Sequence, residues 1–399
     1  MSRRVKVALF ALVALAVAAG TAGLLARSDR SSPQAQTVTT RPRAVDPPPQ
    51  VLVVRRRGGV PAGWDARLRR TRGVTAVART SRTQILLRGS ARAGGGTVTA
   101  VPRGYAIPLD ALVIQPGAYA RVLPQAGAAL DGLERSAVLL SRTSARLRKL
   151  GEGDRLTVAG GRRLRVAGVV DDDLVGLAEV VLTQRAADAP RGATGQLLVA
   201  TTEPDRVERR LARNDGVRIR ALSPGLGTGL RTVPRLVARP LEIKARFGEF
   251  AVGLPYGTDW IRIEPRWLRR NVVTRSIPIL GAVTCNRRLF PPLRRALRAL
   301  ARRGLSHVVD RADYAGCHAP RRIPGSGALS LHAWGLAIDL NAAANPRLGG
   351  SRQDRRLVRA MEEAGFTWGG RWPTVPDPMH FELHAPPAPG ASVSQAPGP

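Results

Sequence analysis

The sequence predicts an α+β protein in which two folded domains follow an N-terminal transmembrane helix. The chain has 399 residues, more than one average domain, so two folded units with linkers are expected, each large enough to bury a core. An uncharged apolar stretch lies near the N-terminus. Short β-rich runs alternate with amphipathic helical segments through the rest of the chain. We therefore expect an N-terminal segment, a tether, a middle domain, a C-terminal domain and a tail.

Residues 1–30 are expected to be a signal-anchor or a signal peptide. Basic residues at positions 3, 4 and 6 precede the uncharged stretch 7–26, whose length is about that needed to cross roughly 30 Å of hydrocarbon as a helix. The basic flank favours an N-terminus that stays in the cytoplasm, so the rest of the chain would lie outside the cell membrane. Our interpretation is a single-pass anchor. Small residues in the stretch also permit cleavage, which would give a secreted chain.

The basic composition does not indicate a nucleic-acid partner. The formal net charge of +34 comes almost entirely from arginine, since lysine occurs only at positions 6, 149 and 244. This bias resembles the coding habit of high-GC bacteria, which weakens any inference from charge to nucleic acid. A basic surface equally suits an anionic cell wall or membrane. No nucleic acid is expected as a partner, and the sequence identifies no protein partner.

Two segments have the composition of unfolded chain. Residues 31–50 are rich in Pro, Ser and Thr and have no apolar period, which is typical of an extended linker. Residues 386–399 are similar in kind and are expected to be a disordered tail.

Residues 51–235 predict a middle α+β domain. Short β-rich runs begin near residues 51, 83, 137, 178 and 195 and are separated by turn residues. Alternating segments flank Gly160 and Gly161 as in a hairpin, a short helix is expected after Ser141, and the acidic run 171–173 is interpreted as a solvated turn. This stretch loosely resembles the extracytoplasmic core domain of macrolide-exporter-type permeases. It contains no histidine, so we expect a spacer, docking or binding role.

Rare, reactive residue types gather in residues 241–385. All five histidines, both cysteines and five of the six tryptophans lie beyond Leu241. Residues 291–305 place leucines on one helical face and arginines on the other, which predicts an amphipathic helix that ends at Gly304. The chemistry is therefore expected in this C-terminal domain.

Two motifs in this domain carry metal-binding chemistry. The first has the pattern S-x-H-x-x-G-x-A-x-D and contains Ser330, His332, Gly335, Ala337 and Asp339. The second contains Asp377, Pro378, Met379 and His380. A hydrolytic zinc needs three nitrogen or oxygen ligands and one open position for water, and His332, Asp339 and His380 supply that set. The side chains of residues 337–340 and 379–383 alternate in character, as in strands, and Pro378 disfavours a helix before the second segment. A lone His-x6-Asp pair is more often a surface pair, but the conjunction of both motifs indicates a zinc site.

These motifs resemble the D-alanyl-D-alanine carboxypeptidase and L-alanyl-D-glutamate peptidase family of zinc enzymes over about residues 241–384. The resemblance implies a small α+β fold with an antiparallel sheet flooring the cleft, Zn2+ as cofactor and peptidoglycan stem peptides as substrates. It makes His332, Asp339 and His380 the zinc ligands and Asp377 the general base. Arg321 matches the arginine that steadies the substrate near the scissile carbonyl, with the neighbouring Arg322 as the alternative.

Further residues of the domain receive roles by position. Four are assigned to substrate binding, with core packing or helix capping as the alternative: Ser330, Trp334, Trp368 and Trp372. Glu382 shares a strand face with His380 and is expected to orient that ligand. Three other histidines, His307, His318 and His384, fit no ligand position. Cys285 and Cys317 are expected to form a disulfide, because an even pair in an oxidising compartment more often bridges than stays free.

The predicted function is hydrolysis of a peptide bond in peptidoglycan stem peptides, outside the membrane, by zinc-activated water. The enzyme would be either a D-Ala-D-Ala carboxypeptidase or an L-Ala-D-Glu endopeptidase. The alternative from another class is a non-catalytic cell-wall-binding or transport-associated module with a structural or vestigial zinc site. Release of fragments from peptidoglycan distinguishes these classes.

Overall fold

The computed structural model describes residues 49–383 apart from 57, 134–135, 177, 188–194, 215, 223–239, 258, 324–326 and 373–374. The described residues all belong to one compact unit. The predicted transmembrane segment 7–26 and the tail 386–399 lie outside the described residues, as does nearly all of the linker 31–50. Within the described ranges, no helix has the length and apolar character needed to span a bilayer.

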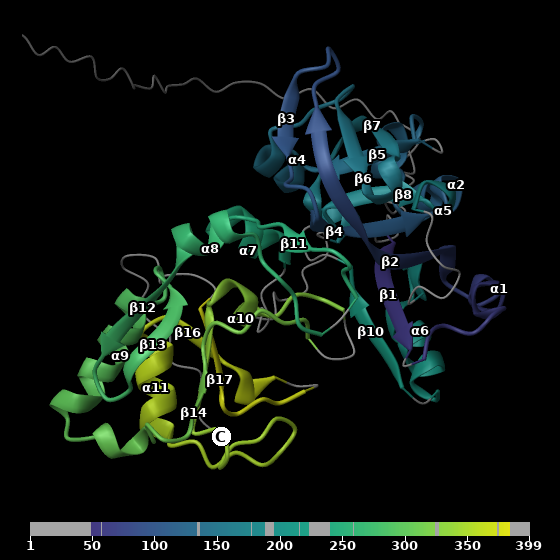
Figure 1. Cartoon of the computed structure of the whole chain (residues 1–399). Coiled ribbons are helices and arrows are strands. Elements are labelled where there is room, and N and C mark those ends of the chain that lie inside the picture. Colours follow the sequence, from purple (N-terminus) through teal and green to yellow (C-terminus); the bar gives the residue numbers. More distant parts are fainter. Residues whose placement is uncertain are drawn as a thin grey trace, which may run out of the picture. The chain divides into compact units, whose positions relative to one another are not determined.

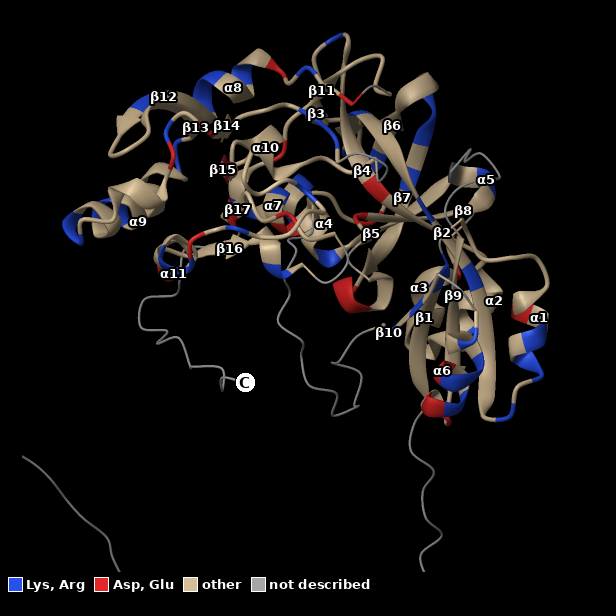
Figure 2. Ribbon diagram, turned by 90° about the horizontal axis from the view of Figure 1, so that it is seen from below, with Lys and Arg blue, Asp and Glu red and all other residues tan. Residues whose placement is uncertain are grey.

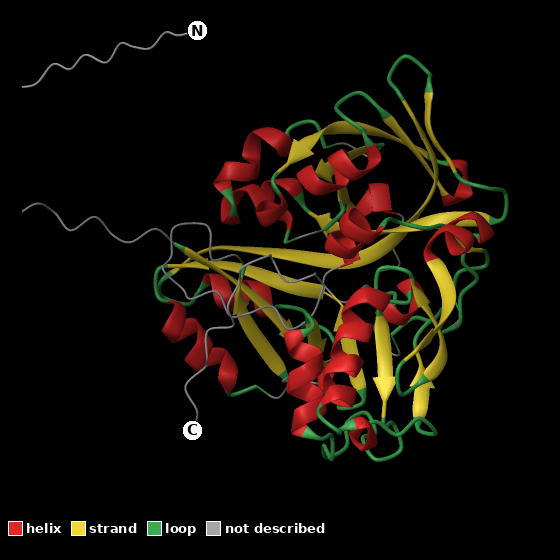
Figure 3. Ribbon diagram, turned by 90° about the vertical axis from the view of Figure 1, so that its left-hand side faces the viewer, coloured by secondary structure: helices red, strands yellow, loops and turns green. Residues whose placement is uncertain are grey.

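A mixed sheet of eleven strands occupies the middle of the chain (Figures 1 and 3). Its order is β10-β1-β9-β2-β6-β7-β5-β8-β4-β11, with β3 paired to β2 and a further pairing of β2 with β4. The strands are β1 (Gln50–Arg56), β2 (Val74–Ala91), β3 (Thr97–Ala100), β4 (Tyr105–Ile114), β5 (Ala137–Ser141), β6 (Arg155–Val158), β7 (Arg163–Val170), β8 (Val180–Thr183), β9 (Gly195–Thr201), β10 (Val217–Ala221) and β11 (Val252–Gly253). Strand β2 is 18 residues long and pairs with β3, β4, β6 and β9, so it joins the two halves of the sheet.

Short helices accompany this sheet. They are α1 (Trp64–Arg69), α2 (Pro116–Val122), α3 (Gly127–Leu130), α4 (Arg142–Arg148), α5 (Gln184–Ala187) and α6 (Pro204–Ala212), with 3-10 turns η1 (Pro124–Ala126), η2 (Ala159–Gly161) and η3 (Asp172–Val175). Three buried apolar clusters pack on the sheet, and α2 and α3 contribute to one of them. The predicted α+β character of this part of the chain is confirmed.

The local predictions for the middle of the chain hold with one change. Strands β6 and β7 pair antiparallel across Gly160 and Gly161, and the helix after Ser141 is α4, which the Ser141 hydroxyl caps. The acidic run 171–173 is solvated at Asp171 and Asp173, as expected of a turn, and the change is that it also enters the 3-10 turn η3. There Asp172 accepts a hydrogen bond from the amide of Thr143 at 3.0 Å, which ties the turn to the first residues of α4.

A smaller antiparallel sheet forms the C-terminal part. Its order is β14-β15-β17-β16, and β12 and β13 form a separate hairpin. The strands are β12 (Val272–Ile277), β13 (Gly281–Asn286), β14 (Tyr314–Gly316), β15 (Ala337–Leu340), β16 (Phe366–Trp368) and β17 (His380–Leu383). The helices are α7 (Pro240–Phe247), α8 (Pro265–Asn271), α9 (Phe290–Arg302), α10 (Leu331–Trp334) and α11 (Arg355–Glu363), with η4 (Ser306–Val308) and η5 (Gly369–Arg371). The small antiparallel sheet that the family resemblance implied is therefore present.

One contiguous apolar core holds this part together. The predicted amphipathic helix is α9, whose buried face includes Leu293, Leu297 and Leu300. It packs against α11, and Arg295 Nη2 donates to the carbonyl of Ala364 just past the end of that helix at 2.9 Å. Basic side chains occur on elements far apart in the chain, among them α1, α8 and α9 (Figure 2), so the positive charge is not confined to one element.

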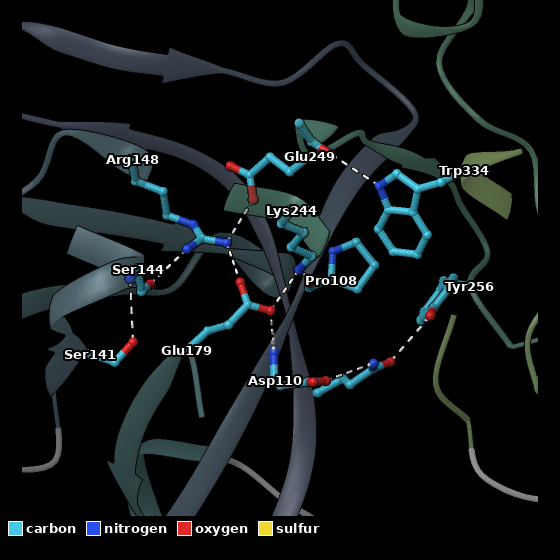
Figure 4. A network of polar contacts seen from close by, with 12 residues as sticks. Pro108, Asp110, Ser141, Ser144, Arg148, Glu179, Lys244, Glu249, Tyr256 and Trp334 are labelled. Carbon is cyan, nitrogen blue, oxygen red and sulfur yellow. Dashed lines mark hydrogen bonds and ion pairs between the residues drawn. The ribbon is translucent and has the colours of Figure 1, made fainter. Parts of the chain in front are cut away.

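A buried ionic network joins α7 to the middle sheet (Figure 4). Glu179 accepts hydrogen bonds from Lys244 Nζ at 2.6 Å and from Arg148 Nη2, and Arg148 Nη2 also pairs with Glu249 at 2.7 Å. Burial alone raises the pKa of Glu179, but the ammonium of Lys244 and the guanidinium of Arg148 outweigh burial and hold that pKa below its ordinary value. Two cations and two carboxylates therefore balance one another where the two parts of the chain meet.

Candidate metal centre

Three side chains that the motifs singled out converge beside the two inner strands of the small sheet, β15 and β17. One potential ligand atom from each of His332, Asp339 and His380 lies within 4.8 Å of the others, and all three residues are buried. His332 Nε2 lies 3.1 Å from Asp339 Oδ2 and 3.1 Å from His380 Nδ1, and His380 Nδ1 lies 2.8 Å from Asp339 Oδ1. This group can hold a metal ion, because two nitrogens and a carboxylate point at one place.

Local structure and strand register bring the three together. His332 lies on the one-turn helix α10, which begins where the Ser330 hydroxyl accepts the His332 amide at 3.3 Å. The helix ends at Gly335, which has a left-handed φ of +65° that favours glycine. Asp339 follows on β15, and the antiparallel register places it directly opposite His380, the first residue of β17. Cross-strand partners lie on the same face of a sheet, so the carboxylate and the imidazole meet.

In each imidazole, the ring nitrogen that faces away from the cluster, here called the outer nitrogen, hydrogen-bonds to an oxygen. His332 Nδ1 lies 2.8 Å from the carbonyl oxygen of Cys317, and His380 Nε2 lies 2.9 Å from Glu382 Oε1. Because a carbonyl oxygen can only accept, His332 Nδ1 donates and its Nε2 keeps a free lone pair. Such bonds from the outer nitrogen are typical of metal-binding histidines. The donor set and its outer bonds therefore fit a zinc ion.

The electrostatics of the cluster favour a cation. Burial raises the pKa of Asp339, but the imidazoles of His332 and His380 outweigh burial and hold that pKa well below its usual range. Burial lowers the pKa of His380, whereas its hydrogen bonds with Asp339 and Glu382 outweigh burial and raise it to about 10. Positive charge is thus stabilised at the point where the ligand atoms meet.

Asp377 lies in the turn that leads into β17. Its carbonyl oxygen accepts the amide of His380 at 3.1 Å, and its own amide donates to the carbonyl of Gly369 at 3.0 Å. Its Oδ1 is buried and has no hydrogen-bond partner among the described residues. Burial raises the pKa of Asp377, and the negative charge of Asp339 raises it further against the positive pull of His380. A carboxylate with a free oxygen and a raised pKa suits proton transfer.

Sequence reasoning missed Gly369. A Cβ at this position would lie 2.6 Å from the carbonyl oxygen of Asp377 and 3.2 Å from the Cβ of His380. Only a glycine lets η5 lie this close to the turn that carries both residues. The glycine pair after Trp368 was the available signal, but nothing local shows which distant backbone it approaches.

The structure distinguishes the two adjacent arginines. Arg321 Nη2 lies 3.9 Å from Asp339 Oδ2, at the metal cluster. Arg322 instead donates from Nε to the carbonyl of Gly327 at 3.0 Å, and its guanidinium lies 5.0 Å from the centre of the Tyr256 ring. Arg321 is therefore the arginine placed beside the cluster.

The residues assigned to substrate binding divide into two groups. Trp334 is only 1% exposed, packs against Phe250 and donates from Nε1 to the carbonyl of Gly248, so it is a core residue and does not line a cleft. Ser330 is a buried helix cap, which is the alternative role given for it, and its assignment to substrate binding stays a prediction. Trp368 and Trp372 are half-buried beside the second motif, where the Trp372 ring lies 5.3 Å from the His380 ring.

The two cysteines are joined. Cys285, on β13, and Cys317, just after β14, form a disulfide with a Cα–Cα distance of 5.5 Å. The carbonyl of Cys317 is the group that accepts His332 Nδ1, so the cross-link anchors the segment that orients this imidazole. Neither His307 nor His318 belongs to the metal cluster, and His384 lies outside the described residues.

Comparison with known proteins agrees with the motifs. Residues 324–383 match the family model of D-alanyl-D-alanine carboxypeptidase, and this span contains the whole metal cluster. The resemblance noted from the motifs is therefore found again by the family model, over this segment of the chain. No curated protein matches the chain at a significant level.

Two solved structures are also similar to part of the chain. The periplasmic region of MacB from Actinobacillus actinomycetemcomitans shares 12% identity, covers 43% of this chain and 89% of that one, and gives a TM-score of 0.28. The extracellular domain of the noncanonic ABC-type transporter YknZ from Gram-positive bacteria shares 13% identity, covers 43% of this chain and 99% of that one, and also gives 0.28. At a TM-score of 0.28, neither structure carries an argument about this chain.

Proposed function

We propose that this protein is a zinc-dependent peptidase that hydrolyses peptide bonds in the stem peptides of peptidoglycan, outside the cell membrane. The observation that carries the proposal is the convergence of His332 Nε2, Asp339 and His380 Nδ1 inside the segment that matches a D-alanyl-D-alanine carboxypeptidase family. The N-terminal stretch 7–26 would tether the chain to the membrane.

The protein's own residues prepare the site for a metal. Bound zinc supplies a Lewis acid that polarises a carbonyl and lowers the pKa of a water. His332, Asp339 and His380 would hold the ion. The Cys317 carbonyl and the Glu382 carboxylate hold the outer nitrogens of the two imidazoles, which keeps the inner nitrogens turned towards the cluster.

Asp377 and Arg321 would act on the reacting groups. The unpartnered Oδ1 of Asp377 would take a proton from the attacking water and pass it to the leaving nitrogen, and its raised pKa brings it closer to the working range of a general base. The guanidinium of Arg321, beside the cluster, would hold the substrate carbonyl or a terminal carboxylate.

Digestion of defined stem peptides tests the activity and identifies the bond. Loss of one terminal D-alanine, seen by mass spectrometry, would show a carboxypeptidase, and two internal fragments would show an L-Ala-D-Glu endopeptidase. No product from any stem peptide with the zinc-loaded protein would refute the proposal and favour a wall-binding module.

Two matched variants separate the roles of the carboxylates. Asp377→Asn should lower turnover by at least about a hundredfold with zinc content unchanged, because a general base contributes about 10²- to 10⁴-fold. Glu382→Gln should mainly weaken zinc binding, since it supports a ligand. If zinc-loaded Asp377→Asn turned over normally and Glu382→Gln did not, the two roles would be reversed.

A further inference from the structure

A second polar site lies on the middle sheet, away from the metal cluster. The register places Arg220 of β10 and Arg55 of β1 on one face of the sheet, and Arg55 Nε donates to Gln196 Oε1 on β9 at 2.7 Å. Gln196 lies opposite Thr80, and Arg82 follows two residues later on the same face of β2. Four adjacent strands thus present arginine or amide side chains on a common face.

This face is hollowed. A pocket of about 490 Å³ is lined by Arg82, Gln84 and Asp110 from the sheet and by Tyr256 and Arg322 from the C-terminal part. A second hollow of about 220 Å³ shares Arg82 and adds Arg55 and Gln196. The larger volume falls within the range of small-ligand sites.

Among the described residues, four arginines at these hollows form no direct ion pairs, although Asp110 stands in the same wall as Arg82. Within the described part of the chain, Arg55, Arg82, Arg220 and Arg322 form no ion pair with a carboxylate. Arg82 Nε is buried without a hydrogen-bond partner. Burial, together with the positive charges of Arg220 and Arg82, lowers the pKa of Arg55 to about 10. Arg82 and Arg322 are half-buried, and holding positive charge there without an ion pair costs free energy that a bound anion would offset.

The other lining groups select the kind of anion. The Tyr256 hydroxyl bonds to Gln84 Oε1 at 3.2 Å, and Gln84 Nε2 donates to Asp110 Oδ1 at 3.1 Å, a chain that Figure 4 shows between Asp110 and Tyr256. An amide, a hydroxyl and a carboxyl suit the hydrogen-bonding groups of a peptide backbone. The planar arginine fork matches a carboxylate, as it also matches a phosphate, so the neighbouring amide and hydroxyl groups are what favour a peptide.

We propose that this pocket binds an acidic peptide, with a carboxylate held by Arg82 and Arg55 and amide groups held near Gln84 and Tyr256. The inference rests on the proposed function, because peptidoglycan stem peptides carry free carboxylates and amides. The wall residue Arg322 directly follows Arg321, which faces the metal cluster. The pocket is thus a distal subsite for the same class of substrate.

Calorimetric binding of a synthetic acidic stem pentapeptide that ends in D-Ala-D-Ala tests the proposal. The full chain carries Asp377→Asn so that turnover does not interfere. Adding Arg82→Gln should weaken binding at least tenfold, as expected when a charge-assisted hydrogen bond is lost. Arg163→Gln removes one exposed charge from β7 and serves as the matched control, with the Kd expected within twofold. If Arg82→Gln melts at a lower temperature, Arg55→Gln, on an exposed residue, replaces it.

Two ligand controls identify the chemistry. The same pentapeptide with its carboxyl groups amidated should bind at least tenfold more weakly, and equimolar inorganic phosphate should not displace the acidic peptide. Equal binding of the amidated peptide, displacement by phosphate, or a Kd unchanged in both arginine variants would overturn the proposal. If the wild-type chain hydrolyses the peptide but both arginine variants bind it with an unchanged Kd, only the pocket proposal is refuted. Arginine-dependent binding without hydrolysis would instead refute only the peptidase function.

Discussion

Replacing Gly369 with alanine tests how closely η5 must approach the turn before β17. The new Cβ would lie 2.6 Å from the carbonyl oxygen of Asp377, whereas ordinary Cβ contacts begin at 3.4 Å. The backbone of Asp377 would therefore have to move by about 0.8 Å (3.4 − 2.6). His380 would move with it, because its Cβ and carbonyl oxygen both lie 3.2 Å from the added atom.

This shift exceeds what a catalytic site tolerates. Catalytic groups must be held within about 0.5 Å of their working positions, and an extra methyl group in a packed region costs about 1–3 kcal/mol. Gly369→Ala should therefore lower the free energy of unfolding by about 1–3 kcal/mol and turnover by at least about tenfold. Zinc affinity should fall as well, since His380 lies in the displaced segment.

Gly350→Ala is the matched control, because its Cβ would have no atom within 4 Å. Both variants are compared by urea unfolding, by metal analysis after dialysis and by turnover of a stem peptide. If Gly369→Ala matched Gly350→Ala in unfolding midpoint, zinc content and turnover, the close approach of η5 to the site would be refuted.

Three further predictions follow from the contacts described. His380→Ala should reduce bound zinc from one per chain to background after dialysis, and undiminished metal content would exclude this residue as a ligand. Replacing Cys285 and Cys317 by alanine should lower the free energy of unfolding by about 3 to 4 kcal/mol, the loop-entropy value for a separation of 32 residues, and a urea midpoint equal to that of the oxidised wild type would contradict this. Glu179→Gln should lower the free energy of unfolding at pH 7 by about 3–5 kcal/mol because it leaves buried cations unpaired, while Glu208→Gln, on an exposed residue, should change it little. The folded-state pKa of Glu179 lies below its ordinary value of 4.5, so its contribution is present above that pH and is lost as the pH falls through the folded pKa. The difference in free energy of unfolding between wild type and Glu179→Gln should thus become smaller in acid. A difference that stays constant from neutral pH to pH 3 would argue against the network.

Features encoded in local patterns were predictable from the sequence. The amphipathic helix α9, the capped helix α4 and the β6–β7 hairpin follow from the spacing of apolar residues, a serine cap and a glycine pair. The three candidate ligands were also identified, because two histidines and an aspartate occur at motif spacings with small residues between them. In each case the signal lies within a few residues of the feature it predicts.

Sequence reasoning erred, or left an alternative open, where a residue type fits two environments. A tryptophan beside a motif histidine can line a cleft or fill a core, and Trp334 fills the core because Phe250 and the Gly248 carbonyl, far away in the chain, cover it. Arg321 and Arg322 have the same chemistry, and alternation along an extended segment sends one towards Asp339 and the other towards Tyr256.

By itself, the sequence determined which side chains are candidates for the chemistry of this protein, their order along the chain and the helices and turns that hold them locally. Only the tertiary structure decided that Asp339 pairs across a ladder with His380, that η5 approaches the Asp377 turn closely enough to require Gly369, and that Glu179 joins the two parts of the chain. The physical reason is that these features depend on contacts between segments distant in sequence, whose approach is set by strand register and core packing. Local periodicity does not encode that approach.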